Sequence, residues 1–401
     1  MFIMFIFSLW LVVISSCCTI PDIKKDENVS CGQLICSNDS RTCTVKRIVT
    51  SQLDNVLSVS GPLALSLFGE SLIEPFNITL LPHELVYLKM SGYTIEDLWF
   101  IDQMPQLKVI ILNTILECDE NLNITNNSAL THISITRTEC LSSFSLSWTN
   151  SPVELILSEN KLEHFNMIGN LENLERLDLS NNQLSQIDVG INSPSLKILN
   201  VSRNSLDHFW LDCGELANKP NLEIVDYSFN NVYILPYCQN IFKKLLKFNV
   251  SHNYIYEIHV GYFAHAGNLR ELDISFNNLL RIVDGTFTKL KQLTVLIMSN
   301  NKLEYLHNNV FSSLIKLEFL DVSNNKLWQF NYDFKESLTS LKTIRIENNS
   351  WICNHLFKLL NAIKSHNITH LQESSCDENV NIDFICCINI PKVVSLEIML
   401  T

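Results

Sequence analysis

The sequence predicts an α/β solenoid, in which short coils stack so that one parallel β-sheet lines a concave side and disulfide-tied caps close both ends. Three observations predict this fold. Segments of alternating apolar residues recur every 22 to 26 residues, and an asparagine occupies the same position in each segment. Cysteines are concentrated before and after the repeats. A period of this length indicates a solenoid, because a single coil cannot bury its own apolar face and must stack on its neighbours.

The amino terminus has the features of a secretory signal peptide at residues 1–18. The apolar run MFIMFIFSLWLVVI is followed by small residues and then by a polar stretch, and cleavage is expected within residues 16–19. An uncleaved anchor is the less favoured alternative, because a spanning helix needs about 20 apolar residues. The tail CCINIPKVVSLEIML is interrupted by Pro391, Lys392 and Glu397, so we expect no membrane span. The chain is therefore expected to be secreted and extracellular.

The charge of the chain limits its partners. The formal net charge is −13, and this field repels phosphate backbones and anionic lipid. We therefore expect no nucleic-acid partner.

The repeats themselves follow one pattern. Lines such as LERLDLSNNQL at Leu174, LRELDISFNNL at Leu269 and LEFLDVSNNKL at Leu317 fit L-x-x-L-x-L-x-x-N-x-L, the leucine-rich repeat, whose coils build a horseshoe. The repeated asparagine can be followed through Asn160, Asn182, Asn204, Asn230, Asn253, Asn277, Asn301, Asn325 and Asn349, and backwards to the degenerate positions Thr138, Ile115 and Tyr93. About nine clear and three degenerate repeats are predicted over residues 85–351.

Each part of the repeat has a physical role. The x-L-x-L segment is a short strand whose alternate leucines point inward, because side chains alternate between faces. The asparagine turns the chain out of the strand and can bond the backbone of neighbouring coils. A phenylalanine recurs after the strands, and we expect it to pack in the core on the convex side, at Phe263, Phe287, Phe311 and Phe334.

Cysteines are expected to tie both caps. Residues 19–84, with Cys31, Cys36 and Cys43, are predicted to form the amino-terminal cap. Residues 352–401 are predicted to form the carboxyl-terminal cap and tail, with a helix for which Asn354 is a candidate amino-terminal cap and with a Cys353–Cys376 bridge across it. The helix is expected to bury the apolar positions Leu356, Phe357, Leu359, Leu360 and Ile363.

Two further cysteine pairs stand at nearly equal places of consecutive repeats. Adjacent coils lie about 5 Å apart, within the reach of a disulfide. We therefore predict bridges between Cys118 and Cys140 and between Cys213 and Cys238.

The cysteine count is odd. Eleven of the 13 cysteines follow the signal peptide, and adjacent cysteines rarely bond each other. Either one thiol stays free or one bridge links the chain to another molecule, and Cys386 and Cys387 are the candidates for such an interchain bond, which would give a disulfide-linked dimer.

Several asparagines lie in Asn-x-Ser/Thr motifs, the acceptors of N-glycans in secreted proteins. The candidates are Asn28, Asn38, Asn77, Asn123, Asn126, Asn200, Asn249 and Asn367. Asn200 and Asn249 belong to the exposed column of the sheet, where serine usually follows two residues later, so the repeat itself creates their motifs. Glycosylation at these two positions is an open alternative.

The exposed sheet face is the expected binding surface. Its central column is predicted to run through Lys89, Ile111, Ser134, Ile156, Asp178, Asn200, Asp226, Asn249, Asp273, Ile297, Asp321 and Arg345. The candidates for partner contact are Ile111, Ile156, Asp178, Asp226, Asp273, Ile297, Phe319 and Asp321. Two alternatives stay open: the apolar residues are scattered and tolerated, and the aspartates are a solvated stripe rather than a site for a basic ligand.

Catalysis has no support in the sequence. There is no G-x-S-x-G, H-E-x-x-H or phosphate-binding motif, so we expect neither an enzyme nor a cofactor. A zinc site could be drawn from Cys353, His355, His366, His370 and Cys376. The secretory context favours a disulfide over that site.

The architecture resembles the mosquito leucine-rich immune proteins of the coil-less type. The resemblance is carried by the signal peptide, the cysteine caps, the repeats of 22 to 26 residues and the terminal Cys-Cys pair. It implies secretion into hemolymph, innate immune recognition or adaptor function, and a protein partner that is complement-like or another leucine-rich repeat chain. The sequence departs from the family in WICNH, where His355 replaces a cap cysteine, and in the absence of a coiled coil.

Two other classes of function fit the same repeats. One is the ectodomain of a Toll-like receptor or adhesion protein whose membrane span is missing. The other is a matrix or inhibitor-type solenoid. A repeat scaffold hosts unrelated partners, so the ligand must be argued from the site.

Overall fold

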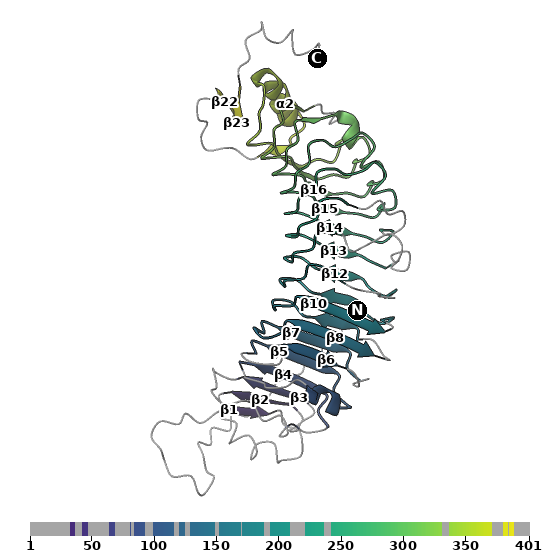
Figure 1. The fold of residues 1–401 in the computed structure, drawn as a ribbon. Coiled ribbons are helices and arrows are strands. Elements are labelled where there is room, and N and C mark those ends of the chain that lie inside the picture. Colours follow the sequence, from purple (N-terminus) through teal and green to yellow (C-terminus); the bar gives the residue numbers. More distant parts are fainter. Residues whose placement is uncertain are drawn as a thin grey trace, which may run out of the picture. The chain divides into compact units, whose positions relative to one another are not determined.

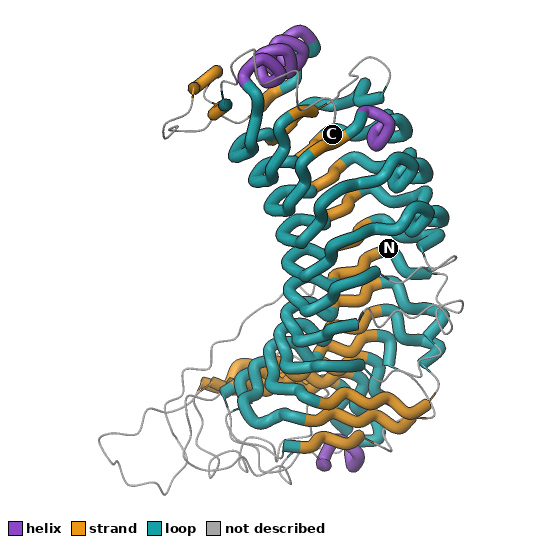
Figure 2. The backbone as a smooth tube through the Cα atoms, turned by 45° about the horizontal axis from the view of Figure 1, so that its top comes forward, coloured by secondary structure: helices purple, strands orange, loops and turns teal. Residues whose placement is uncertain are grey.

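The computed structural model describes residues 33–36, 42–46, 64–68, 81, 84–92, 99–115, 120–124, 129–148, 152–169, 171–187, 193–208, 221–235, 242–330, 337–370, 380–383 and 385–388. The chain divides into two compact units, residues 1–193 and 194–401. In each unit a parallel sheet is built from one short strand per coil (Figures 1 and 2). The predicted parallel-strand solenoid is confirmed.

The first unit begins with an antiparallel pair and continues as a parallel sheet. Strand β1 (Gln33–Cys36) pairs antiparallel with β2 (Thr42–Lys46), and every later strand of this sheet is parallel to the one before it. The parallel strands are β3 (Ala64–Phe68), β4 (Tyr87–Ser91), β5 (Val109–Asn113), β7 (His132–Thr136), β9 (Glu154–Ile156) and β11 (Arg176–Asp178). A short 3₁₀ helix, η3 (Trp99–Gln103), follows β4.

The first unit also contains a second parallel sheet that the sequence analysis did not predict. It has three strands, β6 (Asn121–Ile124), β8 (Ser143–Trp148) and β10 (His164–Gly169), in the order β10-β8-β6. Its register stacks Phe144 beside Phe165, with ring centroids 6.0 Å apart and both side chains buried. These coils therefore have a strand on two sides.

The second unit has shorter strands. The strands of its parallel sheet, each two or three residues long, are β12 (Ile198–Asn200), β13 (Ile224–Asp226), β14 (Lys247–Asn249), β15 (Glu271–Asp273), β16 (Val295–Ile297), β18 (Phe319–Asp321), β20 (Thr343–Arg345) and β21 (Thr369–His370). A two-stranded sheet joins β17 (Tyr305–Leu306) to β19 (Gln329–Phe330), and η5 (Asn308–Phe311) lies between β17 and β18. Turns connect most of the remaining coil.

The core forms as the repeat predicts. The central residue of each three-residue strand is buried, as at Val225, Phe248 and Leu272. The recurring phenylalanines are also buried, and the rings of Phe263 and Phe287 lie 6.1 Å apart. Phe311 is buried as well, whereas Phe334 lies outside the described residues.

The repeated asparagines form a hydrogen-bonded ladder. Asn277 is buried; its Nδ2 donates to the carbonyls of Val250 at 2.9 Å and Ile274 at 3.2 Å, and its Oδ1 accepts from the backbone N–H of Ile255 at 2.9 Å. The same pattern recurs at Asn230, Asn253, Asn301, Asn325 and Asn349. Each asparagine thereby pairs backbone groups that the short strands leave unbonded inside the coil.

The carboxyl-terminal helix α2 (Cys353–Ser365) packs against β19, β21 and β22 (Val380–Ile382). Leu356, Leu359, Leu360 and Ile363 are buried as expected. The expectations for Asn354 and Phe357 are wrong. Ile352 precedes the helix, so Asn354 lies inside the first turn and does not cap it, and Phe357 is 55% exposed because its position faces away from the buried stripe.

The predicted Cys353–Cys376 bridge is also wrong. Cys353 bonds Cys387, which lies in β23 (Ile385–Cys387), the antiparallel partner of β22. The pairing follows from the backbone, because the N–H of Ile388 donates to the Trp351 carbonyl at 2.8 Å and brings β23 beside the start of α2. Cys386 is disulfide-bonded too, so neither Cys386 nor Cys387 is the interchain cysteine that the sequence suggested.

The other predicted cysteine pairs are only partly described. Cys140 is disulfide-bonded, and the backbones of Cys36 and Cys43 are paired in register. The remaining candidates, Cys31, Cys118, Cys213, Cys238 and Cys376, lie outside the described residues. Within the part of the chain that the structure describes, no helix is both long and apolar enough to cross a membrane.

Candidate functional site

The structure brings the predicted central column into register within each unit. In the first unit, Lys89, Ile111, Ser134, Ile156 and Asp178 stand opposite one another on successive strands. In the second unit the line runs through Asn200, Asp226, Asn249, Asp273, Ile297, Asp321 and Arg345. We call this side of each sheet the exposed face.

The apolar candidates are grouped differently in the two units. Ile111 and Ile156 are separated by β7, which places Ser134 between them. In the second unit Ile297 shares its strand with Val295, and Val295 is in register with Phe319. The candidates Ile297 and Phe319 are therefore joined through Val295, whereas Ile111 and Ile156 are not joined.

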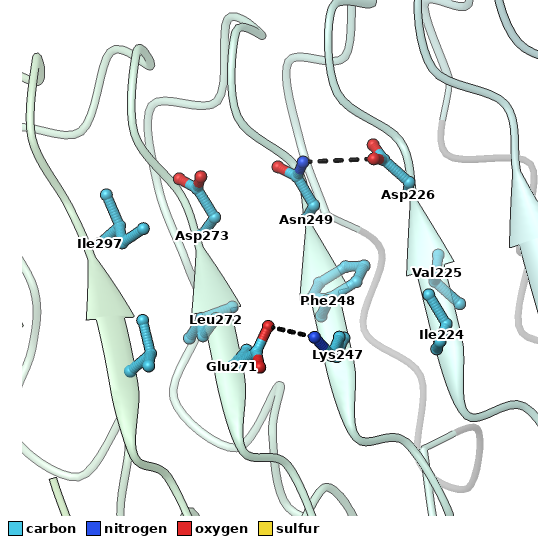
Figure 3. Close-up of a pocket in the computed structure, with 11 residues that line it drawn as sticks. Ile224, Val225, Asp226, Lys247, Phe248, Asn249, Glu271, Leu272, Asp273 and Ile297 are labelled. Atoms are coloured by element: carbon cyan, nitrogen blue, oxygen red, sulfur yellow. Dashed lines mark hydrogen bonds and ion pairs between the residues drawn. The ribbon is translucent and has the colours of Figure 1, made fainter. Parts of the chain in front are cut away.

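An open hollow of about 250 Å³ lies on the exposed face of β13 to β16 (Figure 3). Ile224, Val295 and Ile297 supply apolar side chains to its lining, and Asp226, Asn249 and Asp273 stand in a row beside them. Lys247 and Glu271, also in the lining, form an ion pair of 2.8 Å between Nζ and Oε2. The lining thus combines apolar area with polar groups that can orient a partner.

Every aspartate of the column is held by the same turn. One carboxylate oxygen, Oδ1, accepts hydrogen bonds from the backbone N–H and the hydroxyl of the serine two residues later. For Asp273 these bonds from Ser275 are 2.9 Å and 2.6 Å. The same bonds occur at Asp178, Asp226 and Asp321.

The second oxygen, Oδ2, distinguishes Asp273 from the other three. Oδ2 of Asp178 lies 3.7 Å from Arg176, and that of Asp321 lies 3.5 Å from Arg345. Oδ2 of Asp226 accepts from Nδ2 of Asn249 at 3.3 Å. Asp273 has no such partner among the described residues, and burial raises the pKa of its carboxyl group.

The glycan candidates of the column use the same turn as the aspartates. Oδ1 of Asn200 accepts from the N–H and the hydroxyl of Ser202 at 3.1 Å and 2.8 Å. Oδ1 of Asn249 accepts from the N–H of Ser251 at 3.0 Å, and its side chain lines the hollow. Asn367 is exposed, and the side chains of Asn28, Asn38, Asn77, Asn123 and Asn126 lie outside the description.

Comparison with known families and structures identifies the repeats. Residues 243–303 and 267–327 match the family described as Leucine rich repeat, and residues 173–193 match a second model of the same description. The chain is a leucine-rich repeat protein. Comparison with curated proteins gave no match.

Several solved structures are similar to this leucine-rich repeat protein in fold. A leucine-rich repeat protein of Leptospira interrogans has a TM-score of 0.53 at 18% identity, over 81% of this chain and 98% of its own. The octameric complex of Latrophilin 3, Unc5D and FLRT2, whose leucine-rich repeats belong to FLRT2, gives 0.54 at 20%, over 78% and 94%. The LRIM1/APL1C complex gives 0.53 at 17%, over 88% of this chain and 64% of the matched one.

The turns that follow β12 to β15 carry one feature that was not predicted from the sequence. Three residues after the column, Phe229, His252 and Phe276 stack with centroid distances of 3.9 Å at both steps, and the rings are within about 11° of parallel. The guanidinium of Arg203 lies over Phe229 at 4.0 Å from the ring centroid. We call these four residues the ring ladder; the recurrence of rings at steps of 23 and 24 residues was the signal that could have revealed it.

The zinc arrangement drawn from the sequence is not formed. Cys353 is in a disulfide, so its sulfur is not free to bind a metal ion. No group of three or more candidate ligands comes together among the residues that the structure describes. The leucine-rich repeat solenoid is typically a non-enzymatic scaffold for protein interactions.

Proposed function

We propose that this leucine-rich repeat protein is a secreted binding protein that recognises a protein partner through the exposed face of its second unit, as an innate immune recognition or adaptor protein. The observation that carries the proposal is the hollow on β13 to β16, where Val295 and Ile297 lie beside the Asp226–Asn249–Asp273 row. Most apolar side chains of the repeats are buried, so open apolar area beside unneutralised charge favours a contact surface.

The scaffold suits this role. The asparagine ladder and the buried strands fix the position of each side chain on the exposed face, so little conformational freedom would be lost on binding. The immune assignment draws support from the resemblance in cap and repeat architecture and from the likeness in fold to the LRIM1/APL1C complex. The chain's acidic balance is compatible with a partner that presents a basic patch.

The test places a lysine in the hollow. Ile297→Lys would fill the apolar part and place a positive charge between Asp273 and Asp321, the neighbours of Ile297 in the column. Ile156→Lys is the matched control, since it makes the same change at the same place of the column in the first unit. Tagged proteins would be mixed with body fluid, cross-linked and analysed by mass spectrometry.

The expected result is a specific cross-linked protein with wild type and with Ile156→Lys, and about a tenfold lower yield with Ile297→Lys. A partner that cross-links equally to Ile297→Lys would contradict the proposed surface. The immune assignment further predicts that the partner is a defence protein or a microbial surface protein; a structural matrix protein would overturn it.

Two measurements bear on secretion and on access to the hollow. Amino-terminal sequencing of protein from culture medium should begin within residues 17–20, whereas retention at the cell surface would favour the receptor ectodomain.

Glycopeptide mass spectrometry should find Asn249 unmodified, because a glycan there would cover the hollow that its side chain lines. Complete glycosylation of Asn249 would contradict the proposed binding surface.

A further inference from the structure

The ring ladder is built at a conformational cost. Phe229, His252 and Phe276 have φ values of 55°, 53° and 51°, in the left-handed region that bulky side chains rarely adopt. The same place in other coils holds asparagine, which tolerates this region better, at Asn181, Asn300, Asn324 and Asn348, and threonine, arginine or glutamate at Thr114, Arg137, Glu159 and Arg203. The turn therefore accepts several residue types, and the stacked rings in three successive coils point to a role of the rings themselves.

The ladder is capped at one end only. At the first end, the guanidinium of Arg203 covers the outer face of Phe229. At the other end, Phe276 stacks on His252 with one face, and no ring or cation among the described residues covers its second face. The next residue in this column is Asn300, whose side chain is short, and Phe276 remains 45% exposed.

A carboxylate stands close to the open end. Asp273 lies three residues before Phe276, and its Oδ1 accepts from the backbone N–H of Ser275, the residue directly before Phe276, at 2.9 Å. It is also the column aspartate whose Oδ2 has no partner among the described residues. Ile297, the neighbour of Asp273 in the column, adds apolar area on the next strand.

We infer that the open end of the ring ladder binds an arginine side chain of the protein partner, with its guanidinium stacked on Phe276 and paired with Asp273. The inference rests on the proposed function and names the chemistry of the partner. The chain already contains one such contact, because the guanidinium of Arg203 stacks on Phe229 at 4.0 Å from the ring centroid. Arginine suits the site better than lysine, since its planar group can stack on a ring while it bonds a carboxylate.

The experiment copies the Arg203–Phe229 stack onto Phe276, so that an arginine of the chain itself occupies the proposed site. Asn300→Arg places an arginine in the coil after Phe276, at a φ of 55° that Arg203 and Arg137 already adopt in other coils. It should cover Phe276 from within the chain and exclude the partner's arginine. Asn324→Arg is the matched control, because it adds the same charge one coil further on, where Asn300 rather than a ring is the neighbour. Phe276→Leu removes the ring and keeps an apolar side chain.

The probe is a set of short peptides selected from a random displayed library on the secreted wild-type protein. Selected peptides should share an arginine, and each would be synthesised with arginine, lysine or uncharged citrulline at that position. Fluorescence polarisation should give about tenfold weaker binding for the citrulline peptide, and a similar loss with Asn300→Arg and Phe276→Leu. Asn324→Arg should bind within about twofold of wild type.

The outcomes separate this inference from the proposed function. Peptides that lack arginine, or that bind Asn300→Arg as well as wild type, overturn the inference. If those same peptides no longer bind Ile297→Lys, the proposed binding surface remains supported although the arginine site is ruled out. Peptides whose binding is unchanged by Asn300→Arg, Phe276→Leu and Ile297→Lys contradict both the arginine site and the proposed surface. A selection that yields no peptide contradicts both as well.

Discussion

The earlier coils of the first unit and the coils of the second unit are built in different ways. In the second unit, three-residue strands leave backbone groups unpaired, and a buried asparagine bonds them in coil after coil. In the first unit the earlier coils lack that asparagine, and Thr138 and Ile115 stand in its place. There the strands β4, β5 and β7 are five residues long, and the second sheet of β6, β8 and β10 pairs further backbone groups.

This difference shows that the asparagine is one solution to backbone pairing and not a requirement of the coil. Longer strands on two sides satisfy the same groups through the ladder of a sheet. The exposed faces differ accordingly. The first unit presents separated isoleucines, whereas the second combines the hollow, the aspartate row and the ring ladder.

The largest expected effect is loss of an asparagine in the second unit. Asn277→Ala removes the partner of the Ile255 N–H and leaves a small cavity, and it should lower the free energy of unfolding of this unit by about 4 kcal/mol. Native-state hydrogen exchange of peptides over residues 242–330 measures the change. Asn278→Ala is the control, since its half-buried side chain makes no hydrogen bond to the described residues. A change below about 1 kcal/mol for Asn277→Ala would contradict the ladder.

The terminal disulfide should have the next largest effect. Cys353 and Cys387 are separated by 34 residues, and a bridge across a loop of this size stabilises by about 2 to 4 kcal/mol. Replacing both with serine should therefore speed exchange throughout α2 and leave the first unit unchanged. A peptide map without reduction should recover a Cys353–Cys387 link, and a Cys353–Cys376 link would refute the corrected pairing.

A smaller effect is expected from a substitution at Thr138, the threonine that stands at the asparagine position of its coil. The N–H and the hydroxyl of Thr138 both donate to Oδ1 of Asn160, and the N–H bond is 2.8 Å. Thr138→Val keeps the N–H bond and loses only the hydroxyl, so the first unit should lose about 1 kcal/mol. Exchange of residues 129–148 reports it. A loss as large as that of Asn277→Ala would mean that the two units do not differ as described.

The smallest effect is on the pH dependence of stability, at Asp273. Burial raises its folded pKa above the unfolded value, so the folded state binds more protons in the window between the two values. The charged carboxylate therefore lowers stability as pH rises through that window, and the penalty is complete above the folded pKa. Asp273→Asn keeps the Ser275 bonds, as Asn200 does with Ser202, and should be slightly more stable than wild type at pH 7.

Urea denaturation at pH 7 and at pH 3 measures this difference, which should disappear at the lower pH. The variant creates an Asn-Ile-Ser acceptor, so it must be made in a host without N-glycosylation. A variant less stable than wild type at pH 7 would show that Asp273 already has a compensating partner.

The sequence predicted the parts of the fold that follow from period. The asparagine spacing located the strands from Lys89 to Arg345 and their register, because alternation and coil length leave little freedom. It did not predict the sheet of β6, β8 and β10, in which two coils that lack the asparagine pair with the coil that contains Asn160. The Cys353–Cys387 bond was missed because spacing does not reveal how the chain returns to α2.

The candidate site was predicted only in part. Asp226, Asp273 and Ile297 were assigned from their phase, and all three line the hollow. The ring ladder was missed, because its stacking depends on a left-handed turn that recurs in each coil and brings the rings of neighbouring coils face to face. The predicted column already placed Arg345 beside Asp321, but the 3.5 Å contact between Nη1 of Arg345 and Oδ2 of Asp321, which distinguishes Asp321 from Asp273, is seen only in the structure.

Hydrogen–deuterium exchange of the protein with and without its cross-linked partner tests the central claim most directly. We expect protection of β15, β16 and the turns that follow them, over residues 271–276 and 295–300, with little change at β5 and β9. Protection confined to the first unit, or to neither sheet, would contradict a binding surface on the exposed face of the second unit.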